Sequence, residues 1–203
     1  MQVLKLNISE KFYSLQGEGK RSGTATFFIR LQGCKAKNAC FAMGIKCDTE
    51  FESGTSIPVT ELLQWMEEVN PECKEITFTG GEPLDQLTEE NIKPFKEAGF
   101  YLCIETSGLH PCPSGIDFIC VSPKVAEHVV KKNFPNGVNE LRYVRHSGQS
   151  IPKPSIKAEN YYLSPHSDGF NINTENVKHV INLCLNNPKW KLSVQMHKLW
   201  NIL

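Results

Sequence analysis

The sequence predicts an α/β fold, a partial TIM-like barrel built on a parallel sheet. Apolar, strand-like runs alternate with amphipathic helices, a pattern typical of parallel strands joined by right-handed crossovers. The chain has 203 residues, whereas a complete eight-fold barrel normally takes about 250 residues. Because only three helices stand out in the sequence, we expect a shortened barrel rather than a closed one.

The expected strands are continuously apolar and rich in Ile, Val, Phe and Tyr, as in parallel strands that are covered on a face. They span residues 25–31, 75–79, 101–105, 118–121, 140–144, 161–163 and 191–195. Helical periodicity predicts three helices, over residues 59–69, 89–98 and 175–185. Thr88 and Thr174 are suitable N-caps for the last two, and Gly99 is placed to end the second.

Composition excludes several classes of protein. Lys plus Arg number 22 and Asp plus Glu number 22, so the formal net charge is zero. Phosphate binding usually leaves a basic excess, so a nucleic-acid partner is not expected. The N-terminus lacks a secretory pattern and no run is long enough to span a bilayer, which indicates a cytoplasmic protein without a membrane partner. Eight cysteines raise the question of disulfides, but a full α/β pattern without a signal peptide argues against them.

Three of those cysteines lie in one loop. Cys34, Cys40 and Cys47 follow the strand expected at 25–31, with five and then six residues between them. Three thiolates can hold three irons of a [4Fe–4S] cluster and leave the fourth iron open to a small molecule. Structural zinc, which typically takes four ligands, and three unrelated thiols remain alternative interpretations.

Further polar clusters follow other expected strands. Thr79-Gly80-Gly81-Glu82-Pro83 ends one of them, and its glycines allow the backbone to approach a ligand closely. Its backbone groups could engage an amino group of that ligand, with Glu82 holding it in place, although a plain turn has the same pattern. Similar clusters are Glu105-Thr106-Ser107, Ser122-Pro123-Lys124 and Gln195-Met196-His197-Lys198. In barrels of this type, the chemistry gathers at the C-terminal ends of the strands. His197 on its own would be read as a surface histidine.

Three other groups are candidate ligand contacts. Gln16-Gly17-Glu18-Gly19 offers a carboxylate that can grip a polar heterocycle, although a plain glycine-rich turn has the same pattern. Arg30 lies on an otherwise apolar strand, where it needs a charged partner, either a ligand or an internal carboxylate. Asp48-Thr49 supplies the hard oxygens that suit magnesium.

Taken together, these motifs resemble the radical S-adenosylmethionine superfamily and, more narrowly, the 7-carboxy-7-deazaguanine synthase family. The narrower resemblance includes Tyr13 to Gly19, Phe28 to Cys34, Cys47 to Thr49, Ser122 to Lys124 and Gln195 to Lys198. It spans the chain from about residue 12 to the C-terminus, in the order of the family's motifs.

The resemblance implies one radical S-adenosylmethionine domain over residues 1–203, with a (β6/α3) barrel. It implies a [4Fe–4S] cluster that chelates S-adenosylmethionine, whose radical abstracts hydrogen from 6-carboxy-5,6,7,8-tetrahydropterin. A rearrangement assisted by Mg²⁺ then gives 7-carboxy-7-deazaguanine with loss of ammonia, on the way to queuosine. The family is commonly homodimeric, and a flavodoxin-like or ferredoxin-like protein is the expected reductant.

Site residues follow from the same resemblance. Cys34, Cys40 and Cys47 would ligate the cluster, and Thr49 would ligate magnesium. The residues expected at the cofactor are Gly81, Ser122, Pro123, Lys124, Gln195 and His197. Those expected at the substrate are Leu15, Gln16, Gly17, Glu18, Arg30, Thr79 and the terminal carboxylate of Leu203.

The chain departs from the family pattern at two places. The superfamily's commonest cysteine spacing is three residues and then two, and the family often ends in Gly-x-Pro, whereas this chain ends Asn201-Ile202-Leu203. An activating enzyme for a glycyl-radical protein would share the cysteines but should lack Gln16-Gly17-Glu18-Gly19. A non-catalytic zinc-binding module is the alternative from another class.

Overall fold

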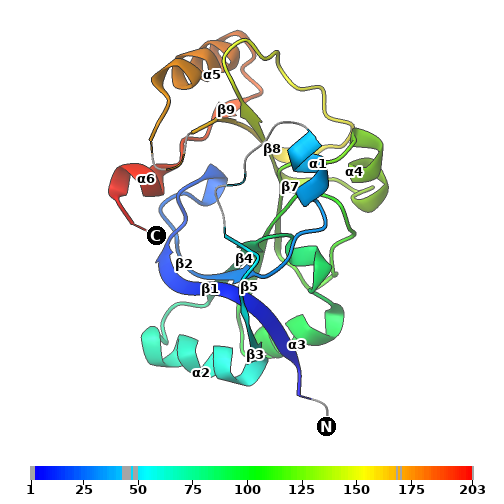
Figure 1. Ribbon diagram of the computed structural model, residues 1–203, viewed down its shortest axis with the longest axis vertical. Coiled ribbons are helices and arrows are strands. Elements are labelled where there is room, and N and C mark those ends of the chain that lie inside the picture. Colours follow the sequence, from blue (N-terminus) through cyan, green and yellow to red (C-terminus); the bar gives the residue numbers. More distant parts are fainter. Residues whose placement is uncertain (1–2, 43–46, 48–49, 168, 170, 203) are drawn as a thin grey trace.

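The computed structural model in Figure 1 describes residues 3–42, 47, 50–167, 169 and 171–202. One nine-stranded sheet organises them, in the order β3-β1-β2-β4-β5-β6-β7-β8-β9. Neighbours from β2 to β9 run parallel, while β1 is antiparallel to both β2 and β3. Because the sheet ends at β3 and β9 without joining them, the predicted partial barrel is confirmed.

The strands are β1 (Lys5–Leu15), β2 (Ala25–Leu31), β3 (Thr55–Pro58), β4 (Glu75–Gly80), β5 (Tyr101–Thr106), β6 (Phe118–Val121), β7 (Val138–Arg145), β8 (Ala158–Pro165) and β9 (Lys191–Leu192). The helices are α1 (Lys37–Ala42), α2 (Val59–Val69), α3 (Glu89–Glu97), α4 (Glu127–Asn133), α5 (Thr174–Asn186) and α6 (Met196–Trp200), with short 3₁₀ turns η1 (Gly19–Arg21) and η2 (Pro83–Asp85). All seven predicted strands and all three predicted helices are present. Figure 1 shows α2 and α3 at one end of the molecule and α5 at the other.

Some elements differ from the prediction. The strands β1 and β3 were not predicted. The first alternates buried residues such as Leu6 and Ile8 with exposed ones and lacks a continuous apolar run, and β3 has only four residues, none of them buried. The short helices α1, α4 and α6 were not predicted either. The last strand ends at Leu192 rather than at residue 195, and α6 begins shortly afterwards.

The helix caps follow the prediction in one case and differ in the other. Thr88 caps α3 in a capping box with Asn91. At α5 the predicted Thr174 is the first helical residue, and Asn173 is the N-cap. Its side-chain oxygen accepts hydrogen bonds from the backbone N–H groups of Glu175 and Asn176, both at 3.1 Å.

The two faces of β2 serve different purposes. On the outer face, Phe27 packs edge-on against Trp65 of α2, with ring centroids 5.3 Å apart. On the inner face, the hydroxyl groups of Thr26 and of Thr77 on β4 lie 3.0 Å apart in a buried pair. Because side chains alternate along a strand, Arg30 shares the inner face with Thr26 and projects into the barrel.

A β-bulge at Ser9 lets β1 contribute to that interior as well. Ile8 pairs with Leu31, but Glu10 pairs with Arg30, so β1 carries one extra residue at this point. The extra residue reverses the alternation of β1 and brings Glu10 and Phe12 to the face of Arg30 and Phe28. Bulges of this kind commonly re-aim side chains near active sites.

The apolar core lies mainly between the sheet and helices α2 and α3, and includes the fully buried Phe78, Phe95, Leu62 and Met66. Within the residues that the structure describes, no helix is long and apolar enough to cross a membrane.

Candidate active site

The carboxyl ends of four neighbouring parallel strands form a continuous rim. Gly33, just after β2, accepts a hydrogen bond of 2.9 Å from the backbone N–H of Glu82, just after β4. The backbone N–H of Ser122, after β6, donates to Thr106 at the end of β5 at 2.8 Å. The predicted cluster loop and the predicted cofactor segments therefore lie along one edge of the sheet.

Glu82 fastens the middle of this rim. It is fully buried, and one carboxylate oxygen accepts from the Thr106 hydroxyl at 2.6 Å and from the Leu84 N–H at 3.1 Å. The other oxygen accepts from the backbone N–H of Ser107 at 2.8 Å and from its hydroxyl. From the sequence, Glu82 was expected to hold an amino group of the ligand. The structure shows its oxygens engaged in joining β4 to β5.

Gly81 lies against the cluster loop. A Cβ atom at this residue would lie 1.8 Å from the carbonyl oxygen of Gly33 and 3.2 Å from the Cβ of Cys34. The sequence had suggested that close approach of a ligand requires glycine here. The structure adds a second reason, which is that the backbone of the cluster loop already fills this space.

We therefore expect Gly81→Ala to displace the backbone next to Cys34 and to lower the iron content of reconstituted protein. Overpacking of this kind costs roughly 1–3 kcal/mol of folding free energy. Gly23→Ala is the control, because Gly23 has open space around it but a φ of +87°. It should lose about 1 kcal/mol of stability and keep its iron. Equal iron content in both variants would contradict this contact.

The cysteine loop is partly described. Cys34 and Cys40 are half-buried, whereas Cys47 is exposed. Burial, with smaller contributions from Glu82, Cys40 and Asp85, raises the pKa of the Cys34 thiol to about 11. Burial also raises the pKa of Cys40, an effect that Lys124 opposes and Cys47 reinforces. The three sulfurs are thus electrostatic neighbours, although in the described part of the chain no three metal-binding side chains are arranged as a metal site.

The donor set nevertheless fits an iron–sulfur cluster. The other cysteines lie elsewhere in the fold: Cys103 and Cys120 form a small buried cluster with Phe118, and the rest pack against the main core. Metal binding would displace the thiol protons and relieve the mutual repulsion of the three thiolates.

Asp85 supports the cluster loop from the side of η2. Its carboxylate accepts a hydrogen bond of 2.8 Å from the backbone N–H of Lys35, the residue after Cys34. Its other oxygen lies 3.0 Å from the Nε2 atom of His110. Asp85 thus holds the backbone next to the first cysteine and lies close to the loop between β5 and β6.

We expect Asp85→Ala to assemble a cluster but to lose iron about tenfold faster under a chelator, since supports of metal ligands typically contribute 10–100-fold to metal retention. Glu89→Ala is the matched control, because Glu89 also accepts a backbone hydrogen bond, and its donor is Ser114 rather than a residue of the cysteine loop. Iron loss at the same rate in native protein and Asp85→Ala would exclude this support.

Ser122, Pro123 and Lys124 follow β6 and continue the rim. The backbone N–H of Lys124 donates to the Ser107 carbonyl at 3.2 Å, and its ammonium lies 3.5 Å from the Ser122 hydroxyl. Because the Lys124 ammonium also acts on Cys40, this segment lies beside the cysteine loop. Its role in cofactor binding stays a prediction.

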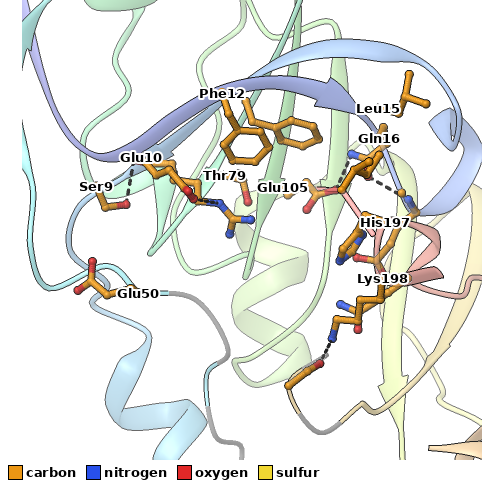
Figure 2. Close-up of a pocket in the computed structure, with 17 residues that line it drawn as sticks. Ser9, Glu10, Phe12, Leu15, Gln16, Glu50, Thr79, Glu105, His197 and Lys198 are labelled. Atoms are coloured by element: carbon orange, nitrogen blue, oxygen red, sulfur yellow. Dashed lines mark hydrogen bonds and ion pairs between the residues drawn. The ribbon is translucent and has the colours of Figure 1, made fainter. Parts of the chain in front are cut away.

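A cavity of about 560 Å³ opens in the mouth of the barrel (Figure 2). In this view Thr79 and Glu105 lie between Glu10 on one side and Gln16 and His197 on the other. All the predicted substrate residues that the structure describes line it: Leu15, Gln16, Gly17, Glu18, Arg30 and Thr79. Thr49 and Leu203 lie outside the described residues, and the neighbouring Glu50 and Ile202 line the cavity.

Gln195 and His197 also line this cavity. The backbone N–H of Met196 donates to the Gly17 carbonyl at 3.0 Å, and a Cβ at Gly17 would lie 2.3 Å from the Nδ1 atom of His197. The structure thus groups Gln195 and His197 with the predicted substrate residues. Their assignment to the cofactor remains a prediction.

Acidic groups line one side of the cavity. Glu105 accepts a hydrogen bond of 3.1 Å from the side-chain amide of Gln16, whose oxygen accepts from the backbone N–H of Glu18 at 3.0 Å. Burial, reinforced by Glu105 and Glu140 and opposed by Arg142 and Ser164, raises the pKa of Glu18.

An ion pair between Arg30 and Glu10 completes the cavity on the side of β2. Arg30 lies 3.0 Å from the carboxylate of Glu10, so the internal partner that the sequence required is present. Five lining residues were not singled out in the sequence, because none of them belongs to a recognisable local motif. They are Ser9, Glu10, Phe12, Glu50 and Gly169.

Comparisons with known proteins agree with this arrangement. A family model described as a 4Fe-4S single cluster domain matches residues 15–99. A 7-carboxy-7-deazaguanine synthase from Bacteroides thetaiotaomicron is 36% identical over 196 residues, covering 96% of this chain and 97% of the relative. One from Haemophilus influenzae is 36% identical over 205 residues, covering 97% and 93%. A crystal structure of QueE from Escherichia coli matches with a TM-score of 0.67 at 22% identity, covering 95% of each chain.

The partial barrel, with a cysteine loop at the end of its first parallel strand, defines an iron–sulfur enzyme of the radical S-adenosylmethionine class. The similarity to the synthases spans nearly the whole chain and its relatives alike. The chain belongs to the 7-carboxy-7-deazaguanine synthase family.

Proposed function

We propose that this chain converts 6-carboxy-5,6,7,8-tetrahydropterin to 7-carboxy-7-deazaguanine with loss of ammonia, for queuosine and other 7-deazapurines. The observation that carries the proposal is the position of the cavity. Its wall contains several carboxylates, and it lies directly beside the rim that carries the cysteine loop. Family membership supports it, and it removes the glycyl-radical activating enzyme and the zinc module as alternatives.

The cavity matches the two ends of this substrate. The aminopyrimidinone ring presents N–H donors, and the carboxylates of Glu18 and Glu105, on the cavity wall opposite Arg30 and Glu10, can accept from them. The substrate's own carboxylate needs a cation, and Arg30 is placed for it on the inner face of β2. Thr79, at the end of β4, adds a hydroxyl near the centre of the cavity.

The rim would hold the cofactors. The thiolates of Cys34, Cys40 and Cys47 would bind the cluster, and Gly81 with Ser122, Pro123 and Lys124 would contact S-adenosylmethionine. When bound and reduced, this pair supplies a carbon radical that removes a hydrogen atom from the substrate. The protein holds the substrate beside the rim and shields both from water. A flavodoxin-like or ferredoxin-like electron donor and a homodimer are part of this proposal.

Magnesium belongs to the proposal through Thr49. Magnesium binds through a few hard oxygens plus waters, so one hydroxyl together with the substrate's carboxylate and carbonyl oxygens suffices. Product formation should rise with added magnesium in the native enzyme, and Thr49→Ala should blunt that response severalfold. Cleavage of S-adenosylmethionine without substrate should hardly change in either protein. The same magnesium response in both would assign Thr49 a structural role, such as capping a turn.

Turnover by reconstituted, reduced enzyme tests the proposed function. We expect 7-carboxy-7-deazaguanine and ammonia in equal amounts from the carboxy-tetrahydropterin, measured by mass spectrometry and an ammonia assay. A cluster-loaded enzyme that leaves the pterin unchanged would contradict it.

A further inference from the structure

A single guanidinium, that of Arg142, contacts two carboxylates of the cavity wall and a third that lies behind it. Arg142 on β7 and Glu140 on the same strand are both buried, at 6% and 1% exposure. The Nε and Nη2 atoms of Arg142 donate to one oxygen of Glu140 at 2.9 and 2.7 Å. Its Nη1 atom lies 3.2 Å from Glu105 and 3.2 Å from Glu18. One cation thus contacts three carboxylates from three different segments.

With all three carboxylates ionised, the charges in this network do not balance. Within the contacts that the structure gives for it, three carboxylates share one guanidinium. A buried ion pair contributes little net stability even when its charges match, and surplus buried charge makes it worse. The surplus acceptors belong to Glu18 and Glu105, which face the cavity, whereas Glu140 lies behind them and is absent from the cavity wall. A ligand that brings N–H donors into the cavity would satisfy those acceptors.

Glu140 also anchors the segment that carries Glu18. Its second oxygen accepts a hydrogen bond of 2.9 Å from the backbone N–H of Lys20. A Cβ at Gly19 would lie 2.1 Å from the first oxygen, and Gly19 has a φ of +66°. Only glycine therefore fits between Glu18 and Lys20 while this carboxylate stays in place. One buried side chain thus fixes both Arg142 and the Gln16-Gly17-Glu18-Gly19 segment.

We propose that Arg142, anchored by Glu140, is a positioning residue that holds Glu18 and Glu105 side by side as acceptors for the heterocycle of the substrate. The inference deepens the proposed function and rests on it. Arg142 and Glu140 lie outside the cavity lining and act through the two glutamates.

The charges around Glu18 give this role a signature in the pH dependence. Glu18 faces Arg142 and Glu140 of β7, Glu105 of β5 and the Ser164 hydroxyl of β8. Arg142 lowers the pKa of Glu18, and Glu140 raises it. The acceptor form of Glu18 is the ionised one, which is lost as the pH falls through its pKa. Loss of the Arg142 charge should therefore move the acidic limb of kcat/KM to higher pH, and loss of the Glu140 charge should move it to lower pH.

The test compares native enzyme with Arg142→Met, Arg142→Lys and Glu140→Gln, each loaded with its cluster. We expect Arg142→Met to raise KM about tenfold or more, as for loss of a charge-assisted contact, and to shift the acidic limb upward. Arg142→Lys should raise KM but leave the limb close to the native position. Glu140→Gln should shift the limb downward.

Arg21→Met is the matched control. Arg21 pairs with Glu75 inside the same barrel, with its Nε atom 3.0 Å from the carboxylate, and is not part of the cavity wall. This variant should lose stability but keep the native KM and pH profile. Should Arg142→Met fail to fold, the downward shift in Glu140→Gln decides the question.

Opposite shifts in Arg142→Met and Glu140→Gln support the inference, because general damage to the fold cannot move the limb in both directions. Native KM and pH profiles in folded Arg142→Met and Glu140→Gln would overturn it, as would equal effects in Arg21→Met. If the native enzyme turns over the pterin but the variants show no shift of the acidic limb, the positioning role alone is overturned. Native enzyme that does not turn over the pterin would overturn the proposed function and this inference together.

Discussion

Replacing Cys40 with alanine should abolish assembly of the [4Fe–4S] cluster. Cys40 lies on α1, within electrostatic range of Cys34 and Cys47. Without its thiolate, only two protein ligands remain in the loop, and two irons would lack protein ligation. We expect the brown colour, the iron and the acid-labile sulfide of anaerobically reconstituted protein to fall to the background level. Activity should be lost with them.

Cys184→Ala provides the control for this experiment. Cys184 lies on α5, outside the cysteine loop, and packs against the apolar core. This variant should bind as much iron as the native protein. A Cys40→Ala protein that reconstitutes a full cluster and still cleaves S-adenosylmethionine would mean that a different thiol completes the site.

Replacing Glu82 with alanine should cost about 3–5 kcal/mol of the free energy of unfolding, because it leaves buried donors without an acceptor. Those donors are the Thr106 hydroxyl, both donors of Ser107 and the backbone N–H of Leu84. Since the same contacts join β4 to β5, the rim should also lose its alignment and the cluster should be retained poorly. Denaturant unfolding of the protein without its cluster measures the first effect directly.

Glu97→Ala is the control for the loss of a carboxylate. Glu97 pairs with Lys93 on the exposed face of α3, with the charged atoms 3.7 Å apart. Its loss should change stability by less than about 0.5 kcal/mol. A Glu82→Ala protein as stable as Glu97→Ala would show that the network around Glu82 does not support the rim.

The barrel could be predicted from the sequence because its parallel strands are continuously apolar and its main helices are amphipathic. The limits of β2 and β6 match the structure, since turn-forming or polar residues border both apolar runs. In contrast, β1 was not predicted because its alternating pattern and the bulge at Ser9 have meaning only opposite β2.

Some residues of the candidate site could likewise be predicted from the sequence, and others could not. The cysteines and the strand-end motifs are visible in the sequence because each is a short local pattern. Glu82, by contrast, was read as a ligand contact, since nothing local shows that Thr106 and Ser107 occupy its oxygens. Arg142 and Glu140 looked like ordinary strand residues, and only the long-range packing of the barrel brings them behind Glu18.

Transfer of deuterium from the substrate to 5′-deoxyadenosine tests most directly whether the substrate cavity and the cofactor rim form one site. Reduced, cluster-loaded enzyme would be mixed with S-adenosylmethionine and a carboxy-tetrahydropterin deuterated at its carbon-bound positions, for a single turnover. If the barrel mouth holds the pterin against the cofactor rim, mass spectrometry should find deuterium in the 5′-deoxyadenosine, together with 7-carboxy-7-deazaguanine. Unlabelled 5′-deoxyadenosine, formed at the same rate with and without the pterin, would contradict the placement of substrate and cofactor in adjoining parts of one site.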